Sequence, residues 1–267
     1  MHHQSRTPAR TPPPGKIVMH DAQPPALQYQ DTFTPPRYSL PLFPVRLTYV
    51  LIAINGLVFI TDNLLNRWVF SLGALAPGLV LQYNQWWRLL SAGFVHADLL
   101  HVGVNLYALY NLGILVERFF GPLRYLGLYF LSLFGANVLV TLFTPLNVPT
   151  VGASGAIMGL LGAALVYFWR YRNLLPQGRR YLNELIRMAV INIGIGLLPG
   201  ISLWGHLGGL LAGSAVGWIL MPYYRAVGEE VRVLRIQPLQ QHAWIYTLVV
   251  FSLMVGFVFL AVGWRVG

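Results

Sequence analysis

Seven long apolar segments are the feature of this sequence that most restricts its fold. They span residues 47–65, 99–116, 123–143, 151–169, 185–198, 202–221 and 243–262. A helix that rises 1.5 Å per residue needs about 20 residues to cross about 30 Å of lipid hydrocarbon, and most of the segments approach that length. Charged residues make up only 10% of the chain, well below the share in soluble domains. We therefore expect an all-α polytopic membrane protein with seven transmembrane helices.

The apolar segments divide the chain into three parts. Residues 1–43 are rich in proline and poor in apolar periodicity, which is typical of a disordered tail. Residues 44–222 contain the first six segments and form the expected membrane core. Residues 223–267 contain a polar linker, "YRAVGEEVRVLRIQPLQQ", and the seventh segment. We expect a six-helix core with one additional C-terminal transmembrane helix, a 6+1 arrangement.

The positions of the 18 Lys and Arg residues explain the formal net charge of +10. If the N-terminus lies in the cytoplasm, all but Arg67, Arg88 and Arg265 fall on the inner side of the membrane. Such a bias sets the orientation of membrane helices and attracts anionic lipid. The charge therefore indicates a lipid bilayer rather than nucleic acid as partner. We expect an integral multi-pass protein of the bacterial inner membrane, with a cytoplasmic N-terminus and its C-terminus outside.

A few polar side chains lie inside the apolar segments, where each is costly unless it is paired. They are His101, Asn105, Asn111, Asn137, Ser154, Asn192 and His206. In the expected orientation the second, fourth and sixth segments all enter from the outer face. His101, Ser154 and His206 fall within the first one or two turns of these segments. Three parallel helices would bring a serine and two histidines to one level, about 5 to 10 Å below the outer boundary.

These residue types suit acyl-transfer chemistry. His101 and Asn105 are four positions apart and project from one helix face. Ser154 lies near a helix N-terminus, where unpaired backbone N–H groups favour an anion. A serine hydroxyl, an imidazole to accept its proton and donors for a developing oxyanion make a hydrolytic site. Taken singly, each residue also has an ordinary structural role, because serine packs well between glycines and histidine can hydrogen-bond between helices.

Glycines in the fourth and sixth segments would let the two helices approach closely. "GASGAIMGLLGAAL" and "WGHLGGLLAGSAVGW" place small residues four positions apart. Gly155 and Gly159 lie on one face of the fourth segment, and Gly205, Gly209 and Gly213 lie on one face of the sixth. Such faces allow backbone contact between membrane helices. If they meet, the serine and the sixth-segment histidine reach the short distance that general-base catalysis requires.

Four motifs in this order resemble the rhomboid family of intramembrane serine proteases: "WWRLLSAGFVHADLLHVGVN", "ERFFG", "GASGA" and "GHLGGLLAG". The resemblance implies that Ser154 is the nucleophile and His206 the general base, a dyad without a carboxylate. It implies an oxyanion hole formed by His101, Asn105 and the Ser154 amide. The expected activity is cleavage of single-pass transmembrane proteins near the outer leaflet, with no metal and no other cofactor. The pattern indicates no particular oligomeric state.

The same resemblance assigns supporting roles to further residues. Trp87 and Arg88 would anchor the first loop in the outer leaflet, and His96 would be a structural hydrogen-bonder near the site. The remaining motif positions are Glu117, Gly121, Gly152, Gly155, Gly209 and Gly213. Met158 stands where the family often has an aromatic residue stacked beneath the base histidine. A thioether can still pack on the imidazole edge, although it positions the ring less firmly.

Two other functions remain open at this point. The chain could be a non-catalytic member of the same fold that binds membrane clients without cutting them. It could instead be a transporter or channel that uses its histidines, but the segments lack acidic relays and interrupted repeats. Metal-dependent proteolysis is disfavoured because there is no His-Glu-x-x-His motif. Aspartyl chemistry is disfavoured because the segments lack a pair of aspartates.

Overall fold

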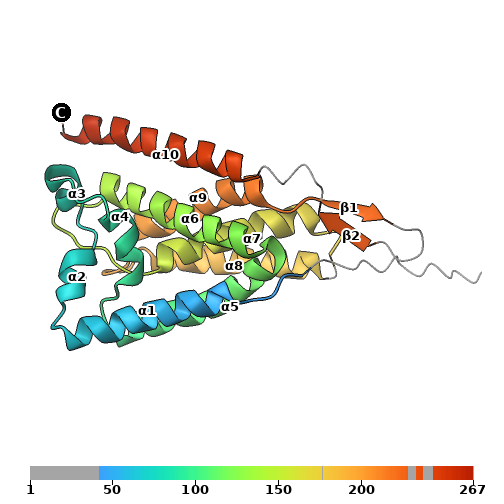
Figure 1. Ribbon diagram of the computed structural model, residues 1–267, viewed down its shortest axis with the longest axis horizontal. Helices are drawn as coiled ribbons and strands as arrows, with labels where there is room; N and C mark the ends of the chain where they lie inside the picture. The colour runs from blue at the N-terminus through green and yellow to red at the C-terminus, as the bar shows by residue number, and fades with distance from the viewer. Residues whose placement is uncertain (1–41, 176, 228–232, 237–242, 267) are drawn as a thin grey trace, which may run out of the picture. The chain divides into compact units, whose positions relative to one another are not determined.

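The fold is given by a computed structural model that describes residues 42–175, 177–227, 233–236 and 243–266. The protein is predominantly helical, which confirms the class expected from the sequence (Figure 1). The long helices are α1 (Leu47–Leu64), α5 (Leu99–Phe120), α6 (Pro122–Phe143), α7 (Ser154–Tyr171), α8 (Gly178–Ile195), α9 (Leu203–Leu220) and α10 (Ala243–Val266). The connection from α1 to α5 contains α2 (Trp68–Gly73), α3 (Pro77–Tyr83), α4 (Arg88–Ser91) and the short 3-10 turn η1 (Ala92–Phe94). The expected tail, residues 1–43, lies outside the described residues except for its last two positions.

Length and apolarity support a membrane-spanning role for part of this set. Among the described residues, α1, α5, α6 and α9 are each long and apolar enough to cross a membrane. In α10 only the stretch Thr247–Gly256 stands out as a shorter apolar segment. The first half of α8 carries Arg179, Arg180 and Arg187, which lower its hydropathy. The chain is therefore an integral multi-pass membrane protein, while the count of seven spans stays a prediction.

A short β-hairpin follows α9, in the stretch that the sequence suggested was only a polar linker. Strand β1 (Tyr224–Val227) pairs antiparallel with β2 (Val233–Ile236), so that Tyr224 lies opposite Ile236. Aromatic side chains tie its beginning to the end of α7. The hydroxyl groups of Tyr167 and Tyr224 lie 2.9 Å apart, and the Tyr171 hydroxyl donates to the Pro222 carbonyl oxygen at 2.9 Å.

The centre of the bundle is formed by α6, α7 and α9, which make the most extensive helix contacts. Around this centre, α1 and α5 pack against each other, and α10 lies against α6 and α9 (Figure 1). The buried residues of α1 are mostly polar: Thr48, Asn55 and Asp62 are buried, and apolar side chains such as Leu57 are exposed. Such an arrangement suits a lipid surrounding, because polar groups in a membrane helix face the protein interior.

Glu117 and Gly121 join the end of α5 to its neighbours. The Glu117 carboxylate accepts the backbone N–H groups of Arg46, Leu47 and Thr48, at 2.8 to 2.9 Å, and also the Thr48 hydroxyl. It therefore satisfies donors at the N-terminus of α1 that have no partner within that helix. Gly121 has a φ of 83°, a conformation that costs other residues energy, and the chain turns there from α5 into α6.

The loop between α1 and α5 is held by side chains bonded to backbone carbonyls. Arg88 is buried, and its guanidinium donates to the carbonyl oxygens of Ala74 at 2.6 Å and Ser71 at 2.9 Å. The Trp87 indole N–H donates to the Leu72 carbonyl oxygen at 3.1 Å, although the residue as a whole is exposed. Arg88 and Trp87 thus fix the α2 end of the loop against α4.

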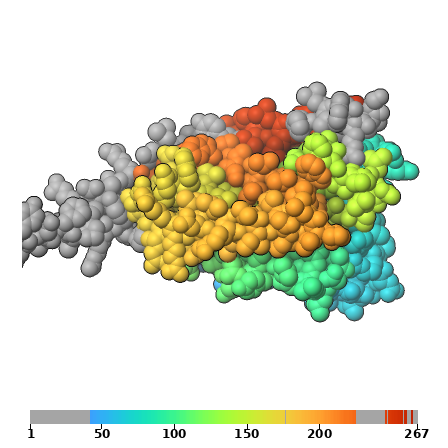
Figure 2. Space-filling model, turned by 180° about the vertical axis from the view of Figure 1, so that it is seen from behind, coloured from blue at the N-terminus to red at the C-terminus, as the bar shows by residue number. Residues whose placement is uncertain are grey.

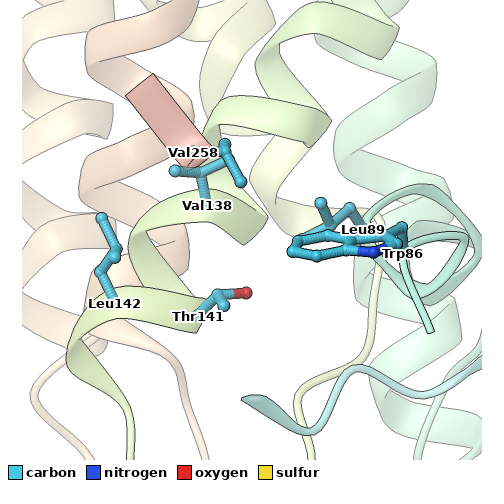
Figure 3. A pocket seen from close by; sticks show the side chains of 6 residues that line it. All are labelled: Trp86, Leu89, Val138, Thr141, Leu142 and Val258. Carbon is cyan, nitrogen blue, oxygen red and sulfur yellow. The ribbon is translucent and has the colours of Figure 1, made fainter. Parts of the chain in front are cut away.

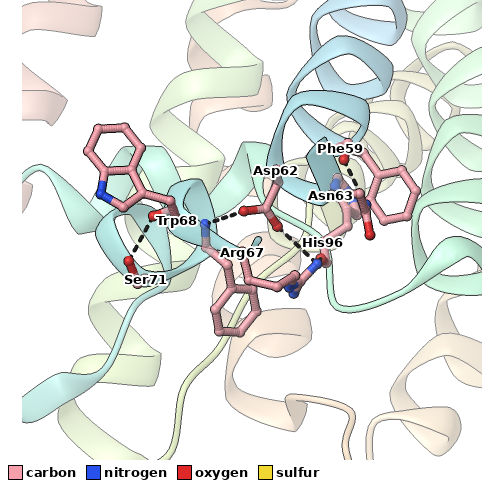
Figure 4. A network of polar contacts seen from close by, with 8 residues as sticks. Phe59, Asp62, Asn63, Arg67, Trp68, Ser71 and His96 are labelled. Atoms are coloured by element: carbon pink, nitrogen blue, oxygen red, sulfur yellow. Dashed lines mark hydrogen bonds and ion pairs between the residues drawn. The ribbon is translucent and has the colours of Figure 1, made fainter. Parts of the chain in front are cut away.

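A second network connects the end of α1 to the loop that precedes α5 (Figure 4). Buried Asp62 pairs with Arg67 at 2.9 Å and accepts the Phe70 backbone N–H at 2.7 Å. Arg67 also donates to the carbonyl oxygen of His96 at 3.1 Å. One buried carboxylate and one guanidinium therefore hold α1, α2 and the approach to α5 together.

Helix α10 packs against another part of the loop between α1 and α5. The rings of Trp86 and Phe259 lie with centroids 6.1 Å apart. Beside them, the loop, α6 and α10 enclose a narrow apolar cavity, whose lining side chains are drawn in Figure 3. Val258 of α10 is buried there against Val138 of α6 and Leu89 of α4. The additional C-terminal helix therefore packs on the loop as well as on the bundle.

Candidate active site

The segment that leads into α7 is fixed before the helix begins. Thr150 forms two backbone hydrogen bonds with Leu75, at 2.7 and 3.0 Å. Gly152 then adopts a φ of 115° and donates its N–H to the Ala92 carbonyl oxygen at 2.9 Å. Ser154, the first residue of α7, is half-buried. The serine therefore lies at a helix N-terminus, and the segment before it is hydrogen-bonded to the loop between α1 and α5 at two points.

The small residues of α7 and α9 meet as the sequence spacing predicted. A Cβ placed on Gly209 would lie 2.1 Å from the Gly155 carbonyl oxygen, and one on Gly213 would lie 2.0 Å from the Gly159 carbonyl oxygen. One turn further along, a Cβ on Gly217 would lie 2.6 Å from the Ala163 Cα. A larger side chain on α9 does not fit between the two helices at these positions. The residue numbers of the contacting pairs increase together along both helices, so α7 and α9 are parallel.

This parallel register brings Ser154 and His206 to nearly the same level. Continued back from the Gly155–Gly209 contact, it pairs Ser154 with Gly208, two positions beyond His206. At a rise of 1.5 Å per residue, the two levels differ by about 3 Å along the helix axes. His206 is 6% exposed, and a Cβ on Gly155 would lie 3.8 Å from the carbonyl oxygen of Gly205, which directly precedes the histidine.

His101 and Asn105 lie on the same side of this site. Asp98 caps α5 by accepting the His101 backbone N–H at 2.8 Å. A Cβ placed on Gly152 would lie 2.6 Å from the His101 Nε2, so the imidazole covers the glycine two residues before Ser154. Asn105 is buried, and its side-chain N–H donates to the His101 carbonyl oxygen at 2.8 Å, which leaves its second N–H for another acceptor.

His96 lies near the site, but among the described residues its ring does not make the hydrogen bonds that its expected role suggested. Its ring is buried and meets the His101 ring edge-on, with centroids 5.2 Å apart. Within the described part of the chain, neither ring nitrogen has a hydrogen-bond partner, and the backbone carbonyl bonds to Arg67 instead. Burial, followed by repulsion from His101, lowers the pKa of His96 to about 4. The ring is therefore neutral near pH 7.

The contact that sequence reasoning missed is made by a backbone atom of α8. His206 Nδ1 lies 2.9 Å from the carbonyl oxygen of Asn192, in the last turn of that helix. The Asn192 side chain had been singled out as a polar group inside the membrane, but its N–H bonds to the Met188 carbonyl oxygen. Met158, one turn after the serine on α7, is buried, and its packing against the His206 ring stays a prediction.

The comparison with known families decides what kind of core this is. A family model described as "Rhomboid domain" matches residues 83–223, which is more than half of the chain. The chain belongs to the rhomboid family. Every residue that the motifs assigned to the site lies inside the matched stretch.

Named relatives of this rhomboid protein come from a plant and a bacterium. RHOMBOID-like protein 6, mitochondrial, of Arabidopsis thaliana is 36% identical over 162 residues, 61% of this chain and 52% of the relative. Rhomboid protease GluP of Bacillus subtilis (strain 168) is 33% identical over 187 residues, 69% of this chain and 35% of the relative. Inactive RHOMBOID-like protein 8 of Arabidopsis thaliana is 31% identical over 141 residues, 53% of this chain and 40% of the relative. The chain spans about half of the length of these relatives or less.

Proposed function

We propose that this rhomboid protein is an intramembrane serine endopeptidase that cleaves transmembrane segments through Ser154 and His206. The observation that carries the proposal is the glycine-to-backbone contact between α7 and α9. Because that contact excludes side chains, it keeps the start of α7 beside the histidine of α9. A relative named as a rhomboid protease supports the same chemistry.

In the proposed reaction the Ser154 Oγ attacks the carbonyl carbon of the scissile bond while His206 accepts the hydroxyl proton. The oxyanion receives hydrogen bonds from His101, from Asn105 and from the Ser154 backbone N–H. His206 then gives the proton to the leaving amine, and the bond between carbon and nitrogen breaks. A water molecule, activated by the same histidine, hydrolyses the ester and releases the serine.

The proposal includes a 6+1 arrangement with a cytoplasmic N-terminus. In this orientation, Ser154 and His206 lie near the outer leaflet, and the substrate is a single-pass protein whose helix unwinds at that level. The distribution of Lys and Arg supports the orientation. The bacterial inner membrane, expected from the sequence, stays a prediction.

A second candidate is a catalytically weak or inactive protein that binds membrane clients. It is favoured by Met158, which replaces an aromatic residue expected beneath His206, and by the relative named as inactive. The two candidates share the fold and differ only in whether a peptide bond breaks.

A cleavage assay separates them. The purified protein is reconstituted in liposomes with a single-pass substrate, and products are measured by mass spectrometry. We expect Ser154→Ala and His206→Ala to abolish cleavage, and Ser252→Ala to leave it unchanged, because Ser252 is exposed on α10. Cleavage retained in Ser154→Ala would contradict the assignment. Absence of cleavage by the unsubstituted protein on a panel of substrates would favour the client-binding function.

A further inference from the structure

The hydrogen bond between α8 and His206 defines the state of the imidazole ring. A carbonyl oxygen can only accept, so the His206 nitrogen that faces Asn192 must carry the hydrogen. A neutral imidazole carries only one N–H, so the hydrogen sits on Nδ1 and Nε2 has a free lone pair. That lone pair is the group that a general base uses to accept a proton.

The acceptor is also the end of a helix. The last carbonyl groups of an α-helix have no partners within it and together carry a partial negative charge. The Asn192 carbonyl oxygen accepts the Gly196 N–H at 3.0 Å as well as the His206 ring. A positive charge on the ring would therefore face the negative end of the 18-residue helix α8.

The carboxylates that the structure describes are all engaged elsewhere. Asp62 pairs with Arg67, and Asp98 caps α5. Glu117 caps α1, and Glu184 pairs with Arg180 on the first half of α8. In this part of the chain, therefore, no acidic side chain contacts His206 in the way that an aspartate contacts the histidine of a catalytic triad.

We propose that the C-terminal end of α8 takes the place of the missing carboxylate. The Asn192 carbonyl orients His206 in the Nδ1–H form, and the helix end stabilises the charge that the ring gains when it accepts the serine proton. This inference rests on the proposed protease function. It assigns the last turn of α8 a positioning role for the base, carried by backbone rather than by a side chain.

The position of this carbonyl depends on few contacts. The only buried residues of α8 are Gly178, Leu185 and Ala189. Figure 2 shows the part of the chain that contains α8, coloured yellow to orange, exposed along one side of the molecule. Near its end, Gly196 packs tightly against α9. A Cβ on Gly196 would lie 3.1 Å from the Ile193 carbonyl oxygen and 3.2 Å from the Leu203 Cα, whereas a Cβ on Gly194 would meet nothing within 4 Å.

These two glycines provide a perturbation and its matched control. Gly196→Val pushes the end of α8 away from α9 and so displaces the Asn192 carbonyl. Gly194→Val adds the same side chain in the same turn without a contact. Gly196→Ala is a milder form of the first substitution if the valine variant does not fold. Each is made in the active protein and in the Ser154→Ala protein.

The first readout is the ring tautomer, measured by ¹⁵N NMR of histidine side chains in the Ser154→Ala background, with His206 assigned by its loss in His206→Gln. We expect the Nδ1–H form in the parent and in Gly194→Val, and a mixture of tautomers in Gly196→Val. An Nε2–H form in the parent would overturn the proposal. Because this background does not cleave, the result is independent of the protease function.

The second readout is cleavage in the active background. A positive histidine at a helix C-terminus is stabilised enough to change a rate by about 2- to 30-fold, so kcat should fall by that factor in Gly196→Val with KM little changed. Gly194→Val should stay near the parent value. If kcat falls while the ring keeps the Nδ1–H form, the Asn192 carbonyl does not set the tautomer, and the orienting role proposed for the α8 end is wrong. If the parent does not cleave at all, the proposed function fails while the tautomer still reports on the hydrogen bond.

Discussion

Gly209 is the position where the smallest change should most disturb the proposed site. A Cβ on this residue would lie 2.1 Å from the Gly155 carbonyl oxygen, far inside the normal contact distance. The contact becomes tolerable only if α7 and α9 separate by about 1 Å. Because Ser154 directly precedes Gly155, this separation moves the serine away from His206. The substitution Gly209→Ala therefore tests the helix contact and the catalytic geometry together.

Two effects of different size follow from this displacement. Overpacking a close helix contact costs about 1 to 3 kcal/mol of stability. A misplacement of reacting groups by about 1 Å can cost about 100-fold in rate. We therefore expect Gly209→Ala to lower kcat/KM by about 100-fold while the protein still folds, with a moderately lower temperature of unfolding in detergent.

The control for Gly209→Ala is Gly256→Ala on α10, where a Cβ would meet nothing within 4 Å. It should leave both cleavage and unfolding temperature near the values of the unsubstituted protein. Cleavage by Gly209→Ala at the unsubstituted rate, with the protein folded, would refute the claim that backbone contact between α7 and α9 sets the site.

Three further substitutions test the supporting structure. Gly152→Ala should abolish cleavage and lower the free energy of unfolding by about 1 to 3 kcal/mol, because the alanine would need a φ of 115° and its Cβ would meet the His101 imidazole. The control is Gly200→Ala, where φ is 82° but the Cβ would meet nothing within 4 Å. This control should show only the backbone cost in thermal unfolding. Glu117→Gln should lower the free energy of unfolding by about 1 to 3 kcal/mol, because four donors lose a charged acceptor. The control, Glu184→Gln, removes one partner of an exposed ion pair and should change the free energy of unfolding by less than about 1 kcal/mol. Equal effects of the two substitutions would contradict the capping role of Glu117. Since the folded pKa of His96 is about 4 and the unfolded value 6.5, the unfolded chain binds the proton first, so the free energy of unfolding should fall by up to about 3 kcal/mol as the pH drops from about 6.5 to 4. His96→Gln should flatten that dependence in a series of unfolding curves, and an unchanged slope would show that another group is responsible.

The contact between α7 and α9 could be predicted from the sequence because it depends on residue size. Glycines four positions apart leave a flat helix face, and two such faces let the backbones of membrane helices approach closely. The spacing of Gly155, Gly209 and Gly213 therefore indicated the α7–α9 contact. His101 and Asn105 lie on one helix face for the same reason, since four residues make nearly one turn.

Backbone-mediated contacts could not be predicted in this way. Every residue has a carbonyl group, so nothing in the side chain of Asn192 indicated that its backbone would bind His206. The hairpin that begins at Tyr224 was missed because a short polar segment between two apolar ones was interpreted as a linker. Pairing of Arg67 with both Asp62 and the His96 carbonyl depends on a loop conformation that residue spacing does not define.

Covalent labelling with a fluorophosphonate probe tests the central claim most directly, because this reagent reacts with a serine only when a base activates it. The modified residue is identified by mass spectrometry of the purified protein. The account predicts a single phosphonylated residue, Ser154, and loss of the modification in His206→Ala. A protein that remains unlabelled, or whose label sits on another serine, would contradict it.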